Sequence, residues 1–215
     1  MISTKQVSKL LLAAGFLVAG AVSAYADSFT VNIDTSSLSG TGGIYFQFNP
    51  GLNSDPASVV ITNFVISGSG VLIPLPTTPG GSLPAGTDGD VTGSLDSPPL
   101  TLANTQALND YLQYLTFGDS IQFQLTFNLP SKFDQSASSF GVEVTNADGL
   151  SSPFDVDENF FNVEMTFDSS GQLQISNSAS QIDIAPSGVP EPGSVVLLLT
   201  VIAAVLLRKR FAIAG

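Results

Sequence analysis

Apolar and polar residues alternate with a period of two through much of the chain. The clearest example is residues 121–127, where Ile, Phe, Leu and Phe alternate with Gln, Gln and Thr. Because successive side chains of a β-strand point to opposite faces of a sheet, this pattern predicts a strand with one buried and one solvated face. Residues 161–167 and 173–175 repeat the pattern around a turn containing Gly171, which predicts a hairpin. Further strands are predicted at residues 29–33, 44–48, 59–66, 71–75, 140–144 and 182–184.

One segment departs from this period. Residues 104–117 carry leucines at helical spacing behind Asn104 or Thr105, either of which suits a helix N-cap, so one short helix is predicted there. The leucines are Leu108, Leu112 and Leu115. Residues 76–99, rich in Pro, Gly, Ser and Thr, are predicted to form a long loop.

Taken together, these elements predict an all-β fold. About nine strands, one short helix, 20 Gly and 13 Pro in the whole chain favour an antiparallel β-sandwich. The expected type is jelly-roll-like or immunoglobulin-like, with inner faces rich in phenylalanine.

The N-terminus has the layout of a secretory signal peptide. Lys5 and Lys9 precede an apolar run over residues 10–22. This run suits the hydrophobic region of a signal peptide, but it is shorter than the ~20 residues that span a bilayer. Ala24 and Ala26 supply the small residues of a cleavage site. We therefore predict a signal helix, cleavage after Ala26 and export by the secretion machinery.

The C-terminus contains three blocks in order. The first, residues 186–193, is rich in Pro and Gly and favours neither helix nor strand, so it is predicted to be a stalk. The second, residues 195–207, is apolar except for Thr200 and predicts a short transmembrane helix. The third is a basic stop, which the positive-inside rule places on the cytoplasmic side. It consists of Arg208, Lys209 and Arg210.

Together these blocks resemble the PEP-CTERM sorting signal of Gram-negative bacteria. The resemblance is confined to the C-terminal tail and rests on the apolar segment, the basic stop and the motif Val189, Pro190, Glu191 and Pro192. It implies recognition by an exosortase, a membrane-embedded transpeptidase-like enzyme, followed by removal of the tail. It also implies a transient single-pass membrane protein that is delivered to the cell surface or to the exopolysaccharide matrix of a biofilm. An unprocessed C-terminal anchor fits the same apolar run and stays open.

Charge is concentrated between the two ends. The chain has 18 acidic and 6 basic residues, and residues 27–187 contain 17 of the acidic ones against Lys132 alone, a formal charge of −16. Such a surface repels nucleic acids and anionic lipid headgroups, so neither is expected as a partner of this part. The predicted segments are a signal peptide (1–26), an acidic β-sandwich domain (27–185), the stalk (186–193), a sorting helix with its basic stop (194–210) and a tail (211–215).

The residue types present exclude most catalytic chemistry. Without His or Cys there is no imidazole base, thiol nucleophile or zinc site built on those ligands. Lys132 is the only basic residue within residues 27–187, which we call the body, and no Ser-x-x-Lys motif contains it. A carboxylate-pair glycosidase remains an alternative, although no spacing singles out two acids. We expect a non-enzymatic protein with no catalytic residue.

Calcium is the one cofactor that the acidic residues suggest. Asp155, Asp157 and Asn159 place oxygen ligands at alternate positions, as in the first part of a calcium-binding loop. Phe160 stands where that loop needs Gly, and Glu164 comes too early to close it. We therefore expect turn-forming acids and no cofactor, while a calcium-dependent adhesin or a glycan-binding module stays open. A second, weaker candidate is Asp88-Gly89-Asp90.

Overall fold

The structure is a computed structural model that describes residues 28–51, 56–75, 84–129, 138–154, 161–168 and 173–187. These residues all belong to one compact unit, Asp27–Ser187. In this described part every regular element is a β-strand, which confirms the all-β prediction, and no helix there is long and apolar enough to cross a bilayer. The predicted signal helix and transmembrane helix lie outside the described residues.

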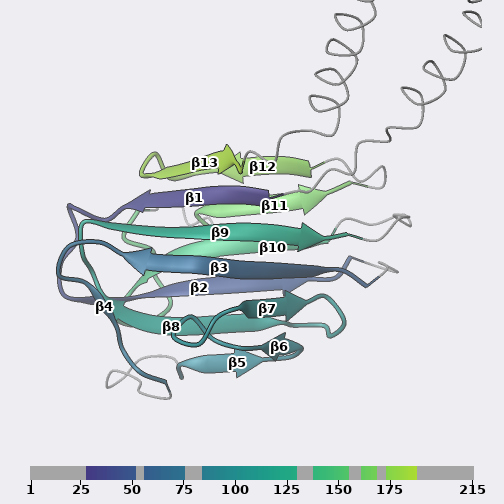
Figure 1. The fold of residues 1–215 in the computed structure, drawn as a ribbon, viewed down its shortest axis with the longest axis horizontal. Coiled ribbons are helices and arrows are strands. Elements are labelled where there is room, and N and C mark those ends of the chain that lie inside the picture. The colour runs from purple at the N-terminus through teal and green to yellow at the C-terminus, as the bar shows by residue number, and fades with distance from the viewer. Residues whose placement is uncertain are drawn as a thin grey trace, which may run out of the picture. The chain divides into compact units, whose positions relative to one another are not determined.

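The strands form two antiparallel sheets (Figure 1). Sheet A consists of β1 (Ser28–Asp34), β3 (Ser58–Ile66), β6 (Val91–Thr92), β7 (Leu100–Ala103), β9 (Ser120–Asn128) and β13 (Ile182–Pro186). Its order is β13-β1-β9-β3-β7-β6. Sheet B consists of β2 (Thr41–Asn49), β4 (Val71–Leu72), β5 (Gly86–Asp88), β8 (Asp110–Thr116), β10 (Ser139–Asn146), β11 (Val163–Phe167) and β12 (Leu173–Asn177). Its order is β12-β11-β10-β2-β8-β4, and β5 also pairs with β8.

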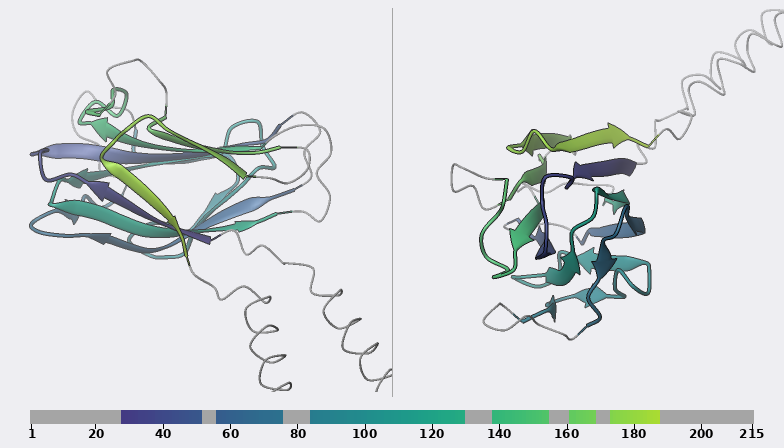
Figure 2. Two further views of the ribbon diagram at one scale, coloured as in Figure 1. Left: turned by 90° about the horizontal axis from the view of Figure 1, so that it is seen from above. Right: turned by 90° about the vertical axis from the view of Figure 1, so that its left-hand side faces the viewer.

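A phenylalanine-rich core joins the two sheets. Figure 2 shows them as two layers, and rings from facing strands meet between them. Phe46 of β2 lies edge-on to Phe123 of β9, with ring centroids 5.4 Å apart. Phe127 of β9 meets Phe140 of β10 at 5.7 Å and Phe167 of β11 at 4.9 Å. Because edge-to-face packing adds to the burial of large apolar side chains, these contacts stabilise the two-layer arrangement.

Most of the predicted strands are present. The structure confirms strands at residues 29–33, 44–48, 59–66, 121–127, 140–144 and 182–184, and the hairpin of β11 with β12. β4 is shorter than the predicted strand at residues 71–75. The segment predicted as a loop, residues 76–99, contains the short strands β5 and β6.

The predicted helix at residues 104–117 is wrong. Its second half is β8, in which five consecutive residues, 111–115, are buried. β8 lies between β2 on one side and β4 and β5 on the other. Asn104 is not a helix cap: its Oδ1 accepts a hydrogen bond from the Ala57 N–H (2.7 Å) and its Nδ2 donates to Ser138 Oγ (2.9 Å).

Three chain segments meet at the turn between β8 and β9. The buried Thr35 donates from Oγ1 to the Gly118 carbonyl (2.8 Å), and the Asp119 N–H donates to the Ser67 carbonyl (3.0 Å). A Cβ at Gly118 would lie 1.9 Å from the Ser67 carbonyl oxygen, so no larger residue fits there. The turn therefore ties the ends of β1 and β3 to the β8–β9 connection.

Candidate functional site

Most of the site residues predicted from sequence lie outside the described residues. This applies to the calcium-loop candidates, the signal cleavage site, the sorting motif and the basic stop. The residues are Asp155, Asp157, Asn159, Ala24, Ala26, Val189, Pro190, Glu191, Pro192, Arg208, Lys209 and Arg210.

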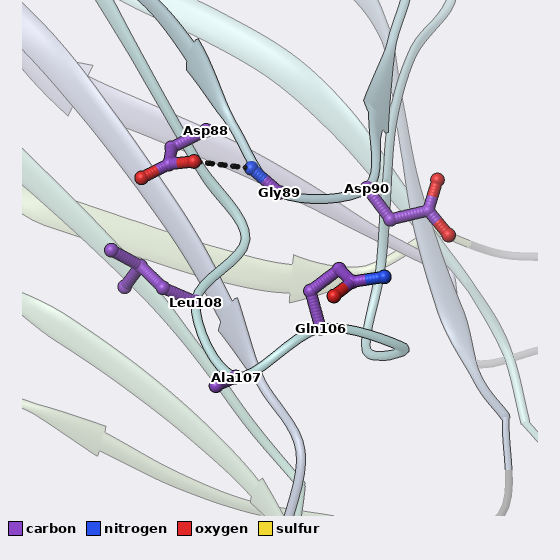
Figure 3. Close-up of a pocket in the computed structure, with 6 residues that line it drawn as sticks. All are labelled: Asp88, Gly89, Asp90, Gln106, Ala107 and Leu108. Atoms are coloured by element: carbon purple, nitrogen blue, oxygen red, sulfur yellow. Dashed lines mark hydrogen bonds between the residues drawn. The ribbon is translucent and has the colours of Figure 1, made fainter.

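The second acidic candidate lines a hollow between the β5–β6 turn and residues 106–108, which precede β8 (Figure 3). Asp88 accepts a hydrogen bond from the N–H of Gly89 (2.8 Å), while Asp90 accepts one from Thr105 Oγ1 (2.6 Å). Figure 3 shows the two carboxylates pointing in different directions. Across the described part of the chain, no three acidic side chains come together where a metal ion could be held.

Glycine is needed at the turn in this hollow. Gly89 has a φ of 73°, in the left-handed region, and a Cβ there would lie 1.9 Å from the Leu108 carbonyl oxygen. The next residue, Asp90, donates its N–H to Asn109 Oδ1 (2.9 Å). Asp88-Gly89-Asp90 is therefore built as a tight turn between two short strands.

A row of hydrogen-bonded polar side chains lies on the outer face of sheet B. Asn49 donates to Gln47 (2.8 Å), Gln47 donates to the Tyr45 hydroxyl (3.0 Å), and Tyr45 donates to Asp110 Oδ2 (2.7 Å). The three β2 residues alternate with the buried residues of the core, so they share one face of the strand. We call Tyr45, Gln47, Asn49 and Asp110 the polar row.

Burial has the largest effect on the pKa values of the two titratable residues in the polar row, Asp110 and Tyr45. It is the main reason why the pKa of Asp110 lies above the ordinary value, and the Asp88 carboxylate, on the residue directly opposite, adds to the rise. The hydrogen bond from Tyr45 opposes it. Burial also raises the pKa of Tyr45, and the negative charges of Asp110 and Glu143 raise it further. Tyr45 therefore remains a hydrogen-bond donor at neutral pH.

An aromatic pair adjoins the polar row. The Tyr45 ring is parallel to the Phe161 ring within 5°, with centroids 6.3 Å apart. Phe161 sits over Gly141 of β10, where a Cβ would approach its ring to 2.4 Å. The glycine thus leaves the space into which this aromatic side chain packs.

A second tyrosine is buried on the inner side of sheet B. Tyr111 donates to Gln113 Oε1 (2.6 Å) and accepts a hydrogen bond from the Leu95 N–H (3.1 Å). Burial raises the pKa of Tyr111 to about 12. Like Tyr45, it is held as a neutral hydrogen-bonding group, so its role in this geometry is structural.

The sequence signals only part of the polar row. The period of two in β2 marks Tyr45, Gln47 and Asn49 as one polar face. Asp110 joins them only because β8 pairs with β2, and Gln47 lies directly opposite Asp110. That pairing was hidden by the helix prediction for the same segment.

Comparisons with protein families, curated proteins and solved structures find no match for this chain.

Proposed function

We propose that this chain is an exported, non-enzymatic protein of the cell surface or extracellular matrix, sorted by its C-terminal tail. In this proposal the secretion machinery translocates it, an exosortase recognises the tail, and the acidic body is released on the outside. The transmembrane helix holds the chain in the cytoplasmic membrane until then. The body acts as a structural component, in contact with exopolysaccharide.

The order of the C-terminal blocks carries this proposal. Pro190-Glu191-Pro192 precedes an apolar run, and the basic stop follows it at once. The tripeptide alone recurs by chance, whereas all three blocks in sequence form a sorting signal with a membrane stop. The predicted signal peptide at the other end supports the same route, because it directs the body across the membrane first.

We also propose that the body is a β-sandwich of the jelly-roll type. Strand pairing is nested, since β1 pairs with β9, β2 with β8 and β3 with β7. Nested pairing is what results when one long antiparallel ribbon folds over into two sheets. The first four strands also alternate between the sheets, whereas the first two strands of an immunoglobulin-like domain share a sheet.

The hydrogen bonds of the acidic side chains support a structural role for the body. Asp34 accepts from the Ser36 N–H (2.9 Å) and hydroxyl (2.6 Å). Asp148 accepts from the N–H groups of Leu150 (2.9 Å) and Ser151 (3.1 Å). These are turn-forming bonds, which the short side chain of Asp makes with backbone two or three residues later.

Replacing the sorting motif tests the proposal in the native host. Changing Pro190, Glu191 and Pro192 together to Ala should leave the tail attached, so that the protein stays in the cytoplasmic membrane at a higher mass than the released parent. Fractionation and intact-mass spectrometry measure both effects. Pro186→Ala, which removes a proline just before the motif, is the matched control and should be processed like the parent. Unchanged mass and release of the triple variant would contradict the proposal.

A further inference from the structure

Two sheets with free edges expose backbone groups that other strands can pair with. Among the described strands, the edges are β13 and β6 in sheet A and β12, β4 and β5 in sheet B. The strands β4, β5 and β6 are two or three residues long, which limits pairing. The two longer edge strands, β12 and β13, lie at the same end of the two sheets (Figure 1).

The edge of β13 is protected. Pro186 has no N–H to offer, and Asp183 adds a charge. The Ile182 carbonyl accepts a hydrogen bond from Asn177 Nδ2 (2.8 Å), and the Ile182 N–H donates to the Ala179 carbonyl (3.1 Å). Little of this strand is left for an incoming partner.

Within the described part of the chain, the edge of β12 has no such protection. Its residues Leu173–Asn177 include neither a charged residue nor a proline, and the last four are exposed. The Ser178 N–H donates to the Asn162 carbonyl (2.9 Å), which identifies this as a hydrogen-bonded pair of the β11–β12 ladder. Because hydrogen-bonded pairs alternate along an antiparallel ladder, every second residue of β12 directs its N–H and C=O to the free side. These residues are Leu173, Ile175 and Asn177.

Apolar surface also reaches this edge. Ile175 pairs with the fully buried Met165 of β11, so it lies on the inner face of sheet B. It nevertheless remains 43% exposed, because none of the described strands lies beyond β12 to continue the core. Leu173, on the same face, packs against the core from its margin. An added strand would cover Ile175 as well as satisfy the backbone groups.

We propose that β12 pairs with β12 of a second copy of this chain, antiparallel and centred on Ile175. In that register Ile175 faces its own equivalent, Leu173 faces Asn177, and Gln174 faces Ser176. The residues that direct N–H and C=O outward then face each other, which forms hydrogen-bonded pairs. A two-fold axis midway between the two Ile175 residues relates the copies, so each copy uses the same surface.

The absence of charged residues from β12 favours this strand as the site of self-association. The body carries a formal charge of −16, so two copies repel wherever acidic surfaces approach. Like charges directly opposite each other across two strands are destabilising, and the five residues of β12 place none there. Association is therefore expected to strengthen as added salt screens the repulsion between the bodies.

Cysteine cross-linking tests the register on the full-length chain, which has no native Cys. The variant Ile175→Cys should form a covalent dimer with a short bifunctional thiol cross-linker in detergent, because facing residues in a hydrogen-bonded pair have Cα atoms only about 5.5 Å apart. Leu150→Cys, at a residue that is 67% exposed, is the control and should stay monomeric. Equal cross-linking at both positions, or none at Ile175, would overturn the proposal.

A charge variant tests the same edge without a thiol. Ile175→Glu places two like charges opposite each other and should weaken self-association at least about tenfold, measured by sedimentation of the full-length chain. Leu150→Glu makes the same charge change elsewhere and should associate like the parent. Thermal unfolding of each variant separates lost association from lost folding. A parent that sediments as a monomer at high salt, or an Ile175→Glu variant that associates like the parent, contradicts the proposal.

Discussion

Asp110 shows how a single partly buried carboxylate is accommodated in this chain. It accepts hydrogen bonds from the Tyr45 hydroxyl (2.7 Å) and from the backbone of Asp88 on the facing strand, while the negative charge of the Asp88 side chain is unfavourable to it. Its raised pKa means that the folded state holds the proton more tightly than the unfolded state. The contribution of Asp110 to the free energy of unfolding is therefore most favourable at low pH. It falls as pH rises from the ordinary Asp pKa through the raised pKa of the folded state.

Replacing Asp110 by Asn should remove the loss of stability that accompanies ionisation of Asp110 at higher pH. Asn keeps a carbonyl oxygen that can accept from Tyr45 and carries no charge, so Asp110→Asn is expected to melt at a higher temperature than the parent at pH 7. At pH 3, below the ordinary Asp pKa of ~3.9, the two should melt alike. Circular dichroism melts at a series of pH values measure the difference.

Asp148 is the matched control, with the opposite sign. Hydrogen bonds from the Leu150 and Ser151 backbone lower its pKa, so it stabilises the fold above the ordinary Asp pKa. Asp148→Asn should therefore melt below the parent at pH 7, and the difference should shrink as pH falls below the ordinary Asp pKa towards the lowered one. If Asp110→Asn instead lowered the melting temperature at pH 7, burial would not be the dominant influence on Asp110.

Individual residues also show what the sequence can reveal of the polar row. Tyr45, Gln47 and Asn49 are visible because strand alternation is local and is written in consecutive positions. Asp110 is not visible, because only long-range pairing brings β8 beside β2. The predicted sorting motif is the reverse case: its prediction rests on the sequence alone, and its residues lie outside the described part of the chain.

At the scale of elements, β8 explains why the sequence predicts a helix where the structure has a strand. A strand that is buried on both faces loses the alternation that identifies a strand, and β8 is buried from Tyr111 to Leu115. Its leucines then match a helical period by coincidence of spacing. β9 was predicted correctly because one face is exposed and polar, with Gln122 and Gln124 between buried residues. Periodicity identifies strands where solvent touches one side of them.

The turn between β8 and β9 gives a prediction for a connection. Gly118→Ala would place a methyl group against the Ser67 carbonyl oxygen, which is backbone and has little room to move. The variant should lose about 2–3 kcal/mol of unfolding free energy, a loss measurable by urea denaturation. Gly40→Ala is the control: Gly40 has a φ of 78° but open space around it, so only the backbone strain of about 1 kcal/mol is expected. Equal losses would show that steric crowding at Gly118 is not decisive.

At the scale of the whole molecule, one core serves both sheets. Phe123 is fully buried in sheet A and meets Phe46 of sheet B, so Phe123→Ala should cost about 3–5 kcal/mol. Among the described residues the tyrosines, Tyr45, Tyr111 and Tyr114, all lie in sheet B. Tyrosine fluorescence therefore reports the unfolding of sheet B, whereas circular dichroism reports both sheets. For Phe123→Ala, both signals should show one unfolding transition, with its midpoint shifted from that of the parent by the same amount. Two transitions with different midpoints would show that the sheets unfold separately.

Nested pairing sets the order in which this body can assemble as it leaves the ribosome. β1 meets β9 through contacts such as Ser28 to Thr126, 98 residues apart, and Thr30 of β1 contacts Ser187, the residue after β13, 157 residues along the chain. Synthesis begins at the N-terminus, so β1, β2 and β3 emerge long before the strands that complete their ladders. Contacts this distant form slowly, since loop closure precedes any gain from pairing. The growing chain thus lacks its native sheets until most of the body has been made, and a polypeptide without its tertiary fold can be threaded through a narrow channel.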